Sequence, residues 1–312
     1  MKLLIEGDGH FTDKKPERRQ DKDFLETMLG KLDQVFQIYR ENNCSAMIQV
    51  GDFFNSPDAS NRVIAALISI IKQNQIVPYV IYGQHDIVGH SGTTFGRSPL
   101  KVLKAAGVIE MLGNYTQCVC TDIDEEERSI FLYGASFGQD IPKVDDPKNF
   151  NVLVIHAMIG NESLYPGQNI TLPQNFSREY KDFNLICCGD YHYYFDIEMG
   201  SRRILNPGCL IRKTIGERDL VLEPSVIIYD TKTNETKRVK LKVDPVNEVF
   251  DFTEKQKASN DEIVGFVESL RNNVDATTFW QDILEKVYVE RKTTDEVKEL
   301  ISESLVFIRE EK

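Results

Sequence analysis

The sequence predicts an α/β fold with a small helical appendage at its C-terminal end. Over residues 1–115, short apolar runs bounded by Gly or Asp alternate with segments of helical apolar spacing. This βαβαβ order implies a largely parallel sheet. Beyond Thr253 the strand-like runs stop and only helical spacing continues. We therefore expect a main domain over residues 1–245 and a helical region over residues 253–312.

Five buried strands are expected, each an apolar run that ends where a polar turn begins. They are Lys2–Ile5, Ala46–Val50, Val77–Tyr82, Val152–Ile155 and Leu185–Cys188. Helices are expected between the first three strands, over Asp21–Glu41 and Asn61–Gln73, where apolar residues recur on one helix face. The Gly-, Ser- and Thr-rich segment 89–96 and the Asp-Pro stretch 143–149 predict loops.

Two β-hairpins are expected in the rest of the main domain. One joins two β-rich runs between Tyr115 and Tyr133 across the acidic turn 122–128. The other joins Val226–Tyr229 to the run 236–243.

The C-terminal region is expected to be helical, because its apolar residues repeat at the spacing of one helix face. Leu300, Ile301 and Leu305 belong to that face. Such a region either caps the main domain or docks another protein. The expected helices are 261–271, 277–290 and 294–309.

The composition is that of a folded globular protein. The 312 residues include 41% hydrophobic and 28% charged side chains, enough for a substantial core. No apolar stretch reaches the roughly 20 residues of a membrane helix, and the six Cys form no zinc-ribbon pattern. We therefore expect a cytoplasmic protein with no membrane contact. Although 14–19 and 202–213 are basic, the net charge of −12 disfavours unaided binding to nucleic acid.

Four of the five histidines fall in short segments that directly follow expected strands. The segments are Asp8-Gly9-His10, Gly51-Asp52, Gly83-Gln84-His85-Asp86, His156 and Gly189-Asp190-Tyr191-His192. In open α/β sheets, sites are built at the edge where the strands end. Carboxylate, imidazole and amide-oxygen ligands suit Mn, Fe, Mg or Zn. The sequence therefore predicts a metal site at that edge.

The order of these segments resembles the signature of the calcineurin-like metallophosphoesterases, written DxH, GDxx, GNHD, H and GHxH. This chain reads GDGH, GDFF, GQHD, H and GDYH. The segment Asn206–Arg212 is also similar to the PGS-x-x-R turn of DNA-repair exonucleases of the SbcD type. The resemblance covers roughly residues 1–230 and implies a β-sandwich flanked by helices.

The resemblance implies two divalent metal ions, with Mn²⁺ preferred and Mg²⁺ or Fe²⁺ as alternatives. Its ligand sets are Asp8, His10 and His192 for the first ion, Asp52 as the bridge, and Gln84, His156 and Asp190 for the second. Two metals about 4 Å apart stabilise the attacking and leaving oxygens in phosphoryl transfer. His85 and Asp86 are the predicted catalytic residues. His85 acts as general acid or transition-state stabiliser, and Asp86 either orients His85 or holds the loop.

Two positions depart from the family pattern, and both belong to the second ion. Gln84 replaces Asn and keeps the amide oxygen on a longer arm, while Asp190 replaces a histidine with a carboxylate. These changes are expected to favour Mn or Mg over Zn. Other interpretations stay open: Gln84 as a non-ligand, Asp190 as a turn residue, His156 as a structural residue, and Asp8 and Asp52 as caps.

The expected function is that of a metal-dependent DNA exonuclease or endonuclease subunit in DNA repair or recombination. By the same resemblance, the partners are a DNA substrate and an SMC-like ATPase of the SbcC type docked on residues 253–312, with a homodimer as a further assembly. Two rivals stay open: a small-molecule phosphodiesterase or phosphatase on the same centre, and a structural subunit with a decayed site. A protein phosphatase is disfavoured, because residues 51–56 read GDFFNS where the signature of that class reads GDxVDRG. Asn55 contacts a phosphate or serves the turn, and His90 matches no motif position.

Overall fold

The computed structural model describes residues 1–113, 117–120, 129–165 and 167–253, which form two six-stranded sheets. The strand orders are β12-β11-β1-β2-β3-β4 and β5-β6-β7-β8-β10-β9. The strands of the first sheet are β1 (Lys2–Glu6), β2 (Ala46–Gln49), β3 (Tyr79–Val80), β4 (Glu110–Met111), β11 (Ser225–Asp230) and β12 (Glu235–Lys240). Those of the second are β5 (Gln117–Cys120), β6 (Ile130–Ala135), β7 (Phe150–His156), β8 (Leu185–Gly189), β9 (Phe195–Met199) and β10 (Arg202–Asn206).

Parallel pairing dominates the centre of each sheet. In the first sheet β1, β2, β3 and β4 pair in parallel, as the βαβ order predicts, and β11 joins β1 antiparallel. In the second sheet β6, β7, β8 and β10 pair in parallel. The motif residues therefore follow β1, β2 and β3 of one sheet and end or follow β7 and β8 of the other.

The interior of the sandwich is an apolar layer between the two sheets. Ile5 and Ile48 of the first sheet pack in one buried cluster with Val152 of the second. Because alternate residues of a strand face opposite sides, Leu4 and Met47 belong to a different cluster, which lies under the helices.

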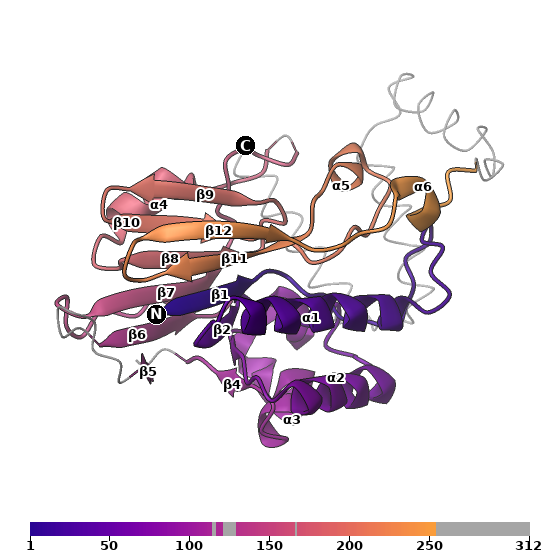
Figure 1. Cartoon of the computed structure of the whole chain (residues 1–312), viewed down its shortest axis with the longest axis horizontal. Coiled ribbons are helices and arrows are strands. Elements are labelled where there is room, and N and C mark those ends of the chain that lie inside the picture. The colour runs from indigo at the N-terminus through magenta and orange to yellow at the C-terminus, as the bar shows by residue number, and fades with distance from the viewer. Residues whose placement is uncertain (114–116, 121–128, 166, 254–312) are drawn as a thin grey trace, which may run out of the picture. The chain divides into compact units, whose positions relative to one another are not determined.

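Helices cover the outer faces of the sheets (Figure 1). The first three helices of the chain pack on the first sheet, and α4 (Pro173–Glu179) contacts β9 and β10 of the second. Asp23 and Ser60 cap the first two, because their side chains accept hydrogen bonds from backbone N–H groups of the first turn. This helix-flanked sandwich confirms the predicted fold class. The helices are α1 (Phe24–Glu41), α2 (Asn61–Asn74), α3 (Pro99–Ala105), α4 (Pro173–Glu179), α5 (Glu217–Leu220) and α6 (Val246–Val249).

The loop predicted after the third motif is wrong in part. The segment 89–96 is not a plain loop but contributes to two short 3₁₀-helices, η2 (Val88–His90) and η3 (Gly92–Arg97). Gly89, at φ 61°, interrupts the helical path inside η2. Gly, Ser and Thr favour both loops and short tight turns, so composition alone does not separate the two.

Both predicted hairpins are confirmed as antiparallel pairs, β5 with β6 and β11 with β12. Residues Met1–Phe252 form one compact unit. The predicted turn 122–128 and the helices predicted beyond Thr253 lie outside the described residues. In the described part of the chain, no helix combines the length and the apolarity needed to cross a membrane.

Candidate metal centre

Loops at the strand ends hold the motif residues in strained backbone conformations. His10, Asp52 and Asp190 have φ values of 51°, 48° and 80°. Such left-handed values are uncommon for residues with a side chain, and they persist where surrounding structure enforces them. Here the His10 amide donates to the Asp52 carbonyl over 2.9 Å, and the Asp190 amide donates to Oδ2 of Asp8 over 3.1 Å. The loops of the two sheets are thus fastened together.

Asp8, His10 and His192 form a first group of ligand-type side chains. Nε2 of His10 lies 3.1 Å from Nε2 of His192, which lies 3.4 Å from Oδ2 of Asp8. Burial lowers the pKa of His10 well below its usual value and lowers the pKa of His192 to about 4. Both rings are therefore neutral at pH 7, and neutral imidazole is the form that binds a metal.

Asp52, His156 and Asp190 form a second group. Nε2 of His156 lies 3.5 Å from Oδ2 of Asp52 and 4.0 Å from Oδ1 of Asp190. The same Oδ2 of Asp52 lies 3.8 Å from Nε2 of His10 in the first group. The Asp52 carboxylate therefore lies between the two groups, where a bridging ligand would have to lie.

The backbone fixes the tautomer of His156. Its Nδ1 lies 2.7 Å from the carbonyl oxygen of Val50, which can only accept, so Nδ1 carries a proton. Its Nε2 is directed at the carboxylates. Burial lowers the pKa of His156, but the carboxylates of Asp52, Asp8 and Asp190 more than offset this and raise it to about 10. Converging carboxylates thus favour positive charge at this point, and a divalent cation supplies it.

Several ligand-type atoms of the centre are buried without a hydrogen-bond partner. Within the described residues they include Oδ2 of Asp52, Oε1 of Gln84 and Nε2 of His156. An unpartnered buried polar atom costs about 1–3 kcal/mol, and coordination to a metal ion would remove that cost. Carboxylate, imidazole and amide oxygen are donors for a hard or borderline divalent cation. The residues present therefore fit the ions that the sequence resemblance implies.

The two residues that depart from the family pattern are bonded to each other. Nε2 of Gln84 donates to Oδ1 of Asp190 over 2.7 Å. Gln84 begins η1 (Gln84–Asp86) after β3, whereas Asp190 follows β8, so the bond links the two sheets. Because the amide nitrogen is used in this way, Gln84 presents its oxygen as the available ligand atom.

His85 and Asp86 have different surroundings. The side chain of His85 is 43% exposed and places Nε2 3.8 Å from Oδ2 of Asp52, so it faces both solvent and the centre. Asp86 is fully buried and joins the loops after β2 and β3. Its carboxylate accepts from the backbone N–H groups of Phe54 (2.7 Å), Gly83 (2.9 Å) and Phe53 (3.2 Å). Of the two roles expected for Asp86, these contacts support holding the loop.

Lys213 lies at the centre, although no sequence motif identified it. Its Nζ donates to Oδ1 of Asn55 over 3.1 Å, and its charge adds to burial in lowering the pKa of both histidines of the first group. Arg212, the arginine of the PGS-like turn, instead donates from Nε to a backbone carbonyl. His90, which matched no motif, lies with its ring 6.3 Å from the ring of His85. The signal for Lys213 was its place at the end of the basic segment 202–213.

The PGS-like turn 206–212 packs directly on the first group. The Leu210 amide donates to the carbonyl of Asp8, and the Cys209 amide donates to the carbonyl of His192, each over 3.1 Å. Gly208 has φ 81°, and a Cβ there would come within 2.8 Å of the His192 carbonyl oxygen. Glycine is therefore required for this close approach.

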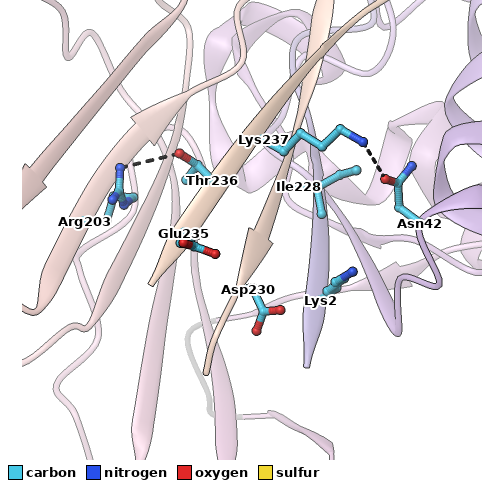
Figure 2. A pocket seen from close by; sticks show the side chains of 8 residues that line it. All are labelled: Lys2, Asn42, Arg203, Ile228, Asp230, Glu235, Thr236 and Lys237. Atoms are coloured by element: carbon cyan, nitrogen blue, oxygen red, sulfur yellow. Dashed lines mark hydrogen bonds between the residues drawn. The ribbon is translucent and has the colours of Figure 1, made fainter. Parts of the chain in front are cut away.

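A pocket of about 520 Å³, whose lining is drawn in Figure 2, lies at the opposite end of β1 from this centre. Lys2, at the start of β1, lines it, whereas Asp8 follows the end of β1. Figure 2 shows Lys237 directed at Asn42, to which it donates over 3.0 Å. Arg203, another lining residue, donates to a carboxylate over 2.7 Å. Two of its cations, Lys237 and Arg203, are thus engaged within the protein, and the pocket does not belong to the metal centre.

Comparison with known proteins gives a family and a fold. The sequence matches the calcineurin-like phosphoesterase family over residues 1–194. It matches no curated protein. Among solved structures, an archaeal phosphodiesterase is 16% identical with a TM-score of 0.40, and the match covers 77% of this chain and 100% of that one. A dimetal phosphatase from Danio rerio is 10% identical with a TM-score of 0.51, covering 77% and 95%. The latter likeness concerns the fold and agrees with the two-sheet sandwich.

Proposed function

The chain belongs to the calcineurin-like phosphoesterase family, and we propose that it is a metal-dependent nuclease that hydrolyses phosphodiester bonds in DNA. One observation carries the hydrolytic part of this proposal. Asp52 and His156, each with a buried and unpartnered ligand atom, form one cluster with Asp190 that fits a divalent cation. Gln84, whose Oε1 is also unpartnered, is bonded to Asp190. We assign this cluster to the second of two ions, with Mn²⁺ preferred and Mg²⁺ or Fe²⁺ as alternatives.

Each residue of the centre has a distinct task in this proposal. Two bound ions would stabilise charge on the attacking and leaving oxygens during displacement at phosphorus. Asp52 joins the two ligand groups. His85, open to solvent on one side, is available to protonate the leaving oxygen, and such assistance contributes roughly 10²–10⁴-fold. Lys213, held beside Asn55, offers an ammonium group to a phosphate oxygen of the substrate.

Two features favour DNA as the substrate. The turn 206–212, which carries the likeness to nucleases of the SbcD type, borders the first ligand group through Leu210 and Cys209. Lys213 follows that turn and adds a cation at the centre. Because the chain has a net charge of −12, we further propose an SMC-like ATPase of the SbcC type as a partner that helps to bind DNA.

The partner proposal depends on residues 253–312, whose predicted apolar helix faces suit docking. A chain truncated after Phe252 should keep its metals and its activity on a small phosphodiester, because every motif residue precedes that point. It should no longer co-purify with the ATPase. Unchanged co-purification would contradict the docking role.

The nuclease proposal is tested by incubating the metal-loaded chain with linear DNA and, in parallel, with bis-p-nitrophenyl phosphate. We expect cleavage of both, with Asp52→Asn inactive because a neutral amide bridges two cations poorly. Asp140→Asn, an exposed substitution, is the matched control. The net charge favours a second candidate, a small-molecule phosphodiesterase or phosphatase. Hydrolysis of the small diester alone, with the ATPase present, would support that candidate, and inactivity on both would indicate a structural subunit.

A further inference from the structure

A pocket of about 410 Å³ is lined by residues that adjoin a ligand-type residue of the candidate metal centre in the chain. Its wall includes Tyr191 and Tyr193, the residues on either side of His192 in the chain. Asp219, which follows the lining residue Arg218 in α5, accepts from the backbone N–H (2.9 Å) and the hydroxyl (2.7 Å) of Thr214. Thr214 follows Lys213, so these bonds tie the wall of the pocket to the segment that reaches the centre. A group bound in this pocket would therefore be close to a phosphate held at the metals.

The lining of this pocket consists largely of flat surfaces. The rings of Tyr191 and Tyr193 meet edge to face with centroids 5.5 Å apart, and the guanidinium of Arg218 lies 5.7 Å from the centroid of the Tyr193 ring. Tyr191 is only 3% exposed and Arg238 lies 4.1 Å from the ring centroid of Tyr194, so Tyr193 offers the most available ring. Tyrosine rings and guanidinium planes are the surfaces on which nucleobases stack.

The polar groups of the pocket suit the edge of a base and not a second phosphate. Asn161 offers an amide, and Glu162 offers a carboxylate that repels anions and accepts from amino groups. Glu162 lies 3.2 Å from Arg218, which leaves the guanidinium largely neutralised toward an anionic ligand. A volume of about 410 Å³ lies in the usual range for small-molecule sites.

We infer that this pocket, lined by Tyr191, Tyr193, Glu162 and Arg218, binds a nucleobase of the substrate next to the phosphate held at the metal centre. The inference rests on the proposed function, because it gives the diester a nucleoside on one side. It goes beyond that function by naming the subsite that would separate nucleotide substrates from other phosphate esters.

Titration calorimetry can measure the contribution of the base to binding separately from that of the phosphate. The full-length, Mn²⁺-loaded chain is titrated with dAMP and, separately, with 2-deoxyribose 5-phosphate, and chromatography verifies that each ligand stays intact. Both ligands carry the same phosphate, so the ratio of their dissociation constants reports the base alone. We expect dAMP to bind roughly tenfold more tightly, the scale of one stacked base. A ratio near one would overturn the inference.

Substitutions in the pocket test whether the preference for dAMP arises there. Tyr193→Leu should bring the ratio close to one, whereas Tyr193→Phe should keep it, because the ring survives. Arg218→Gln, at a side chain that is 43% exposed, gives a second test if Tyr193→Leu does not fold, and it should lower the ratio. A tenfold preference that survives in every folded variant places the base elsewhere and overturns the inference. Because binding is measured without turnover, a chain that prefers dAMP yet leaves DNA intact would contradict only the nuclease proposal.

Discussion

Replacing Asp86 with asparagine would separate a residue that holds the loops from one that takes part in the chemistry. In the native chain its two carboxylate oxygens accept from three backbone amides, at 2.7, 2.9 and 3.2 Å. The asparagine side chain would have one acceptor oxygen. In its better orientation that oxygen keeps the two bonds now made by Oδ2, while the amide nitrogen faces the donor of Phe54.

The expected loss of stability follows from these contacts. One orphaned buried N–H costs about 1–3 kcal/mol, and two bonds that change from a charged to a neutral acceptor weaken by about 1 kcal/mol each. Burial and the nearby charge of Asp52 raise the pKa of Asp86 to about 7, which means that the ionised carboxylate is itself disfavoured in the folded chain. A neutral asparagine avoids this penalty, and that gain offsets roughly 1 kcal/mol of the loss. We therefore expect Asp86→Asn to lower the free energy of unfolding by about 2–4 kcal/mol.

Urea denaturation monitored by circular dichroism would measure this loss. The experiment is done at pH 8, above the pKa of about 7, so that the ionised carboxylate is the species compared. A chelator removes the linkage between folding and metal binding. Asp140→Asn, at an exposed position, should change stability by less than about 0.5 kcal/mol. A native-like stability of Asp86→Asn together with a large fall in turnover would refute the loop-holding role and make Asp86 a catalytic residue.

Three further predictions concern the same centre. His85→Ala should retain its metals by elemental analysis while turnover falls by roughly 10²–10⁴-fold, and a loss of metal would instead make His85 a ligand. Gln84→Asn and Asp190→His, alone and combined, should shift metal preference toward Zn²⁺, with a coupling of about 0.5–3 kcal/mol in binding titrations; strictly additive effects would mean that their bond has no role. Burial raises the pKa of Glu6 from 4.5 to about 8, so its stabilising contribution is complete below pH 4.5 and is lost as pH rises through 8. With a chelator present, the free energy of unfolding of the native chain should fall by about 1.4 kcal/mol per pH unit between pH 5 and 8, measured relative to that of Glu6→Gln. The same pH dependence of stability in both chains would contradict this.

The strands around the site were predictable because they are short, buried and apolar, and because each ends at a polar turn. β3 is the instructive exception. The apolar run 77–82 predicted a longer strand, but only Tyr79–Val80 pairs in the ladder. Pro78 has no N–H to donate, and beyond Ile81 the chain turns toward η1. α3 was not predicted, although Ser98 followed by Pro99 is a strong signal for a helix start, and both take those roles.

The ligand-type residues were predictable because the ends of parallel strands bring short polar motifs to one edge. Asp8, Asp52, His156 and His192 meet there, although up to 184 positions separate them in the chain. Lys213 was not predicted as a site residue, because the PGS-like motif ends at Arg212. The motif gives no information on the direction of the side chain that follows it. Neighbouring residues of an extended segment point to opposite sides. Here Arg212 anchors the chain to a carbonyl while Lys213 faces the centre.

The pair Gln84 and Asp190 shows why departures from a pattern should be considered together. Taken separately, a longer amide and a carboxylate in place of an imidazole each weaken the expected second metal site. In the structure the longer arm of Gln84 reaches Asp190 and holds it at 2.7 Å, so one change accommodates the other. The carboxylate also adds a negative charge to a cluster that already contains Asp8 and Asp52. More anionic oxygen and one fewer imidazole favour a harder ion, which is the physical reason to expect Mn²⁺ or Mg²⁺ before Zn²⁺ in this protein.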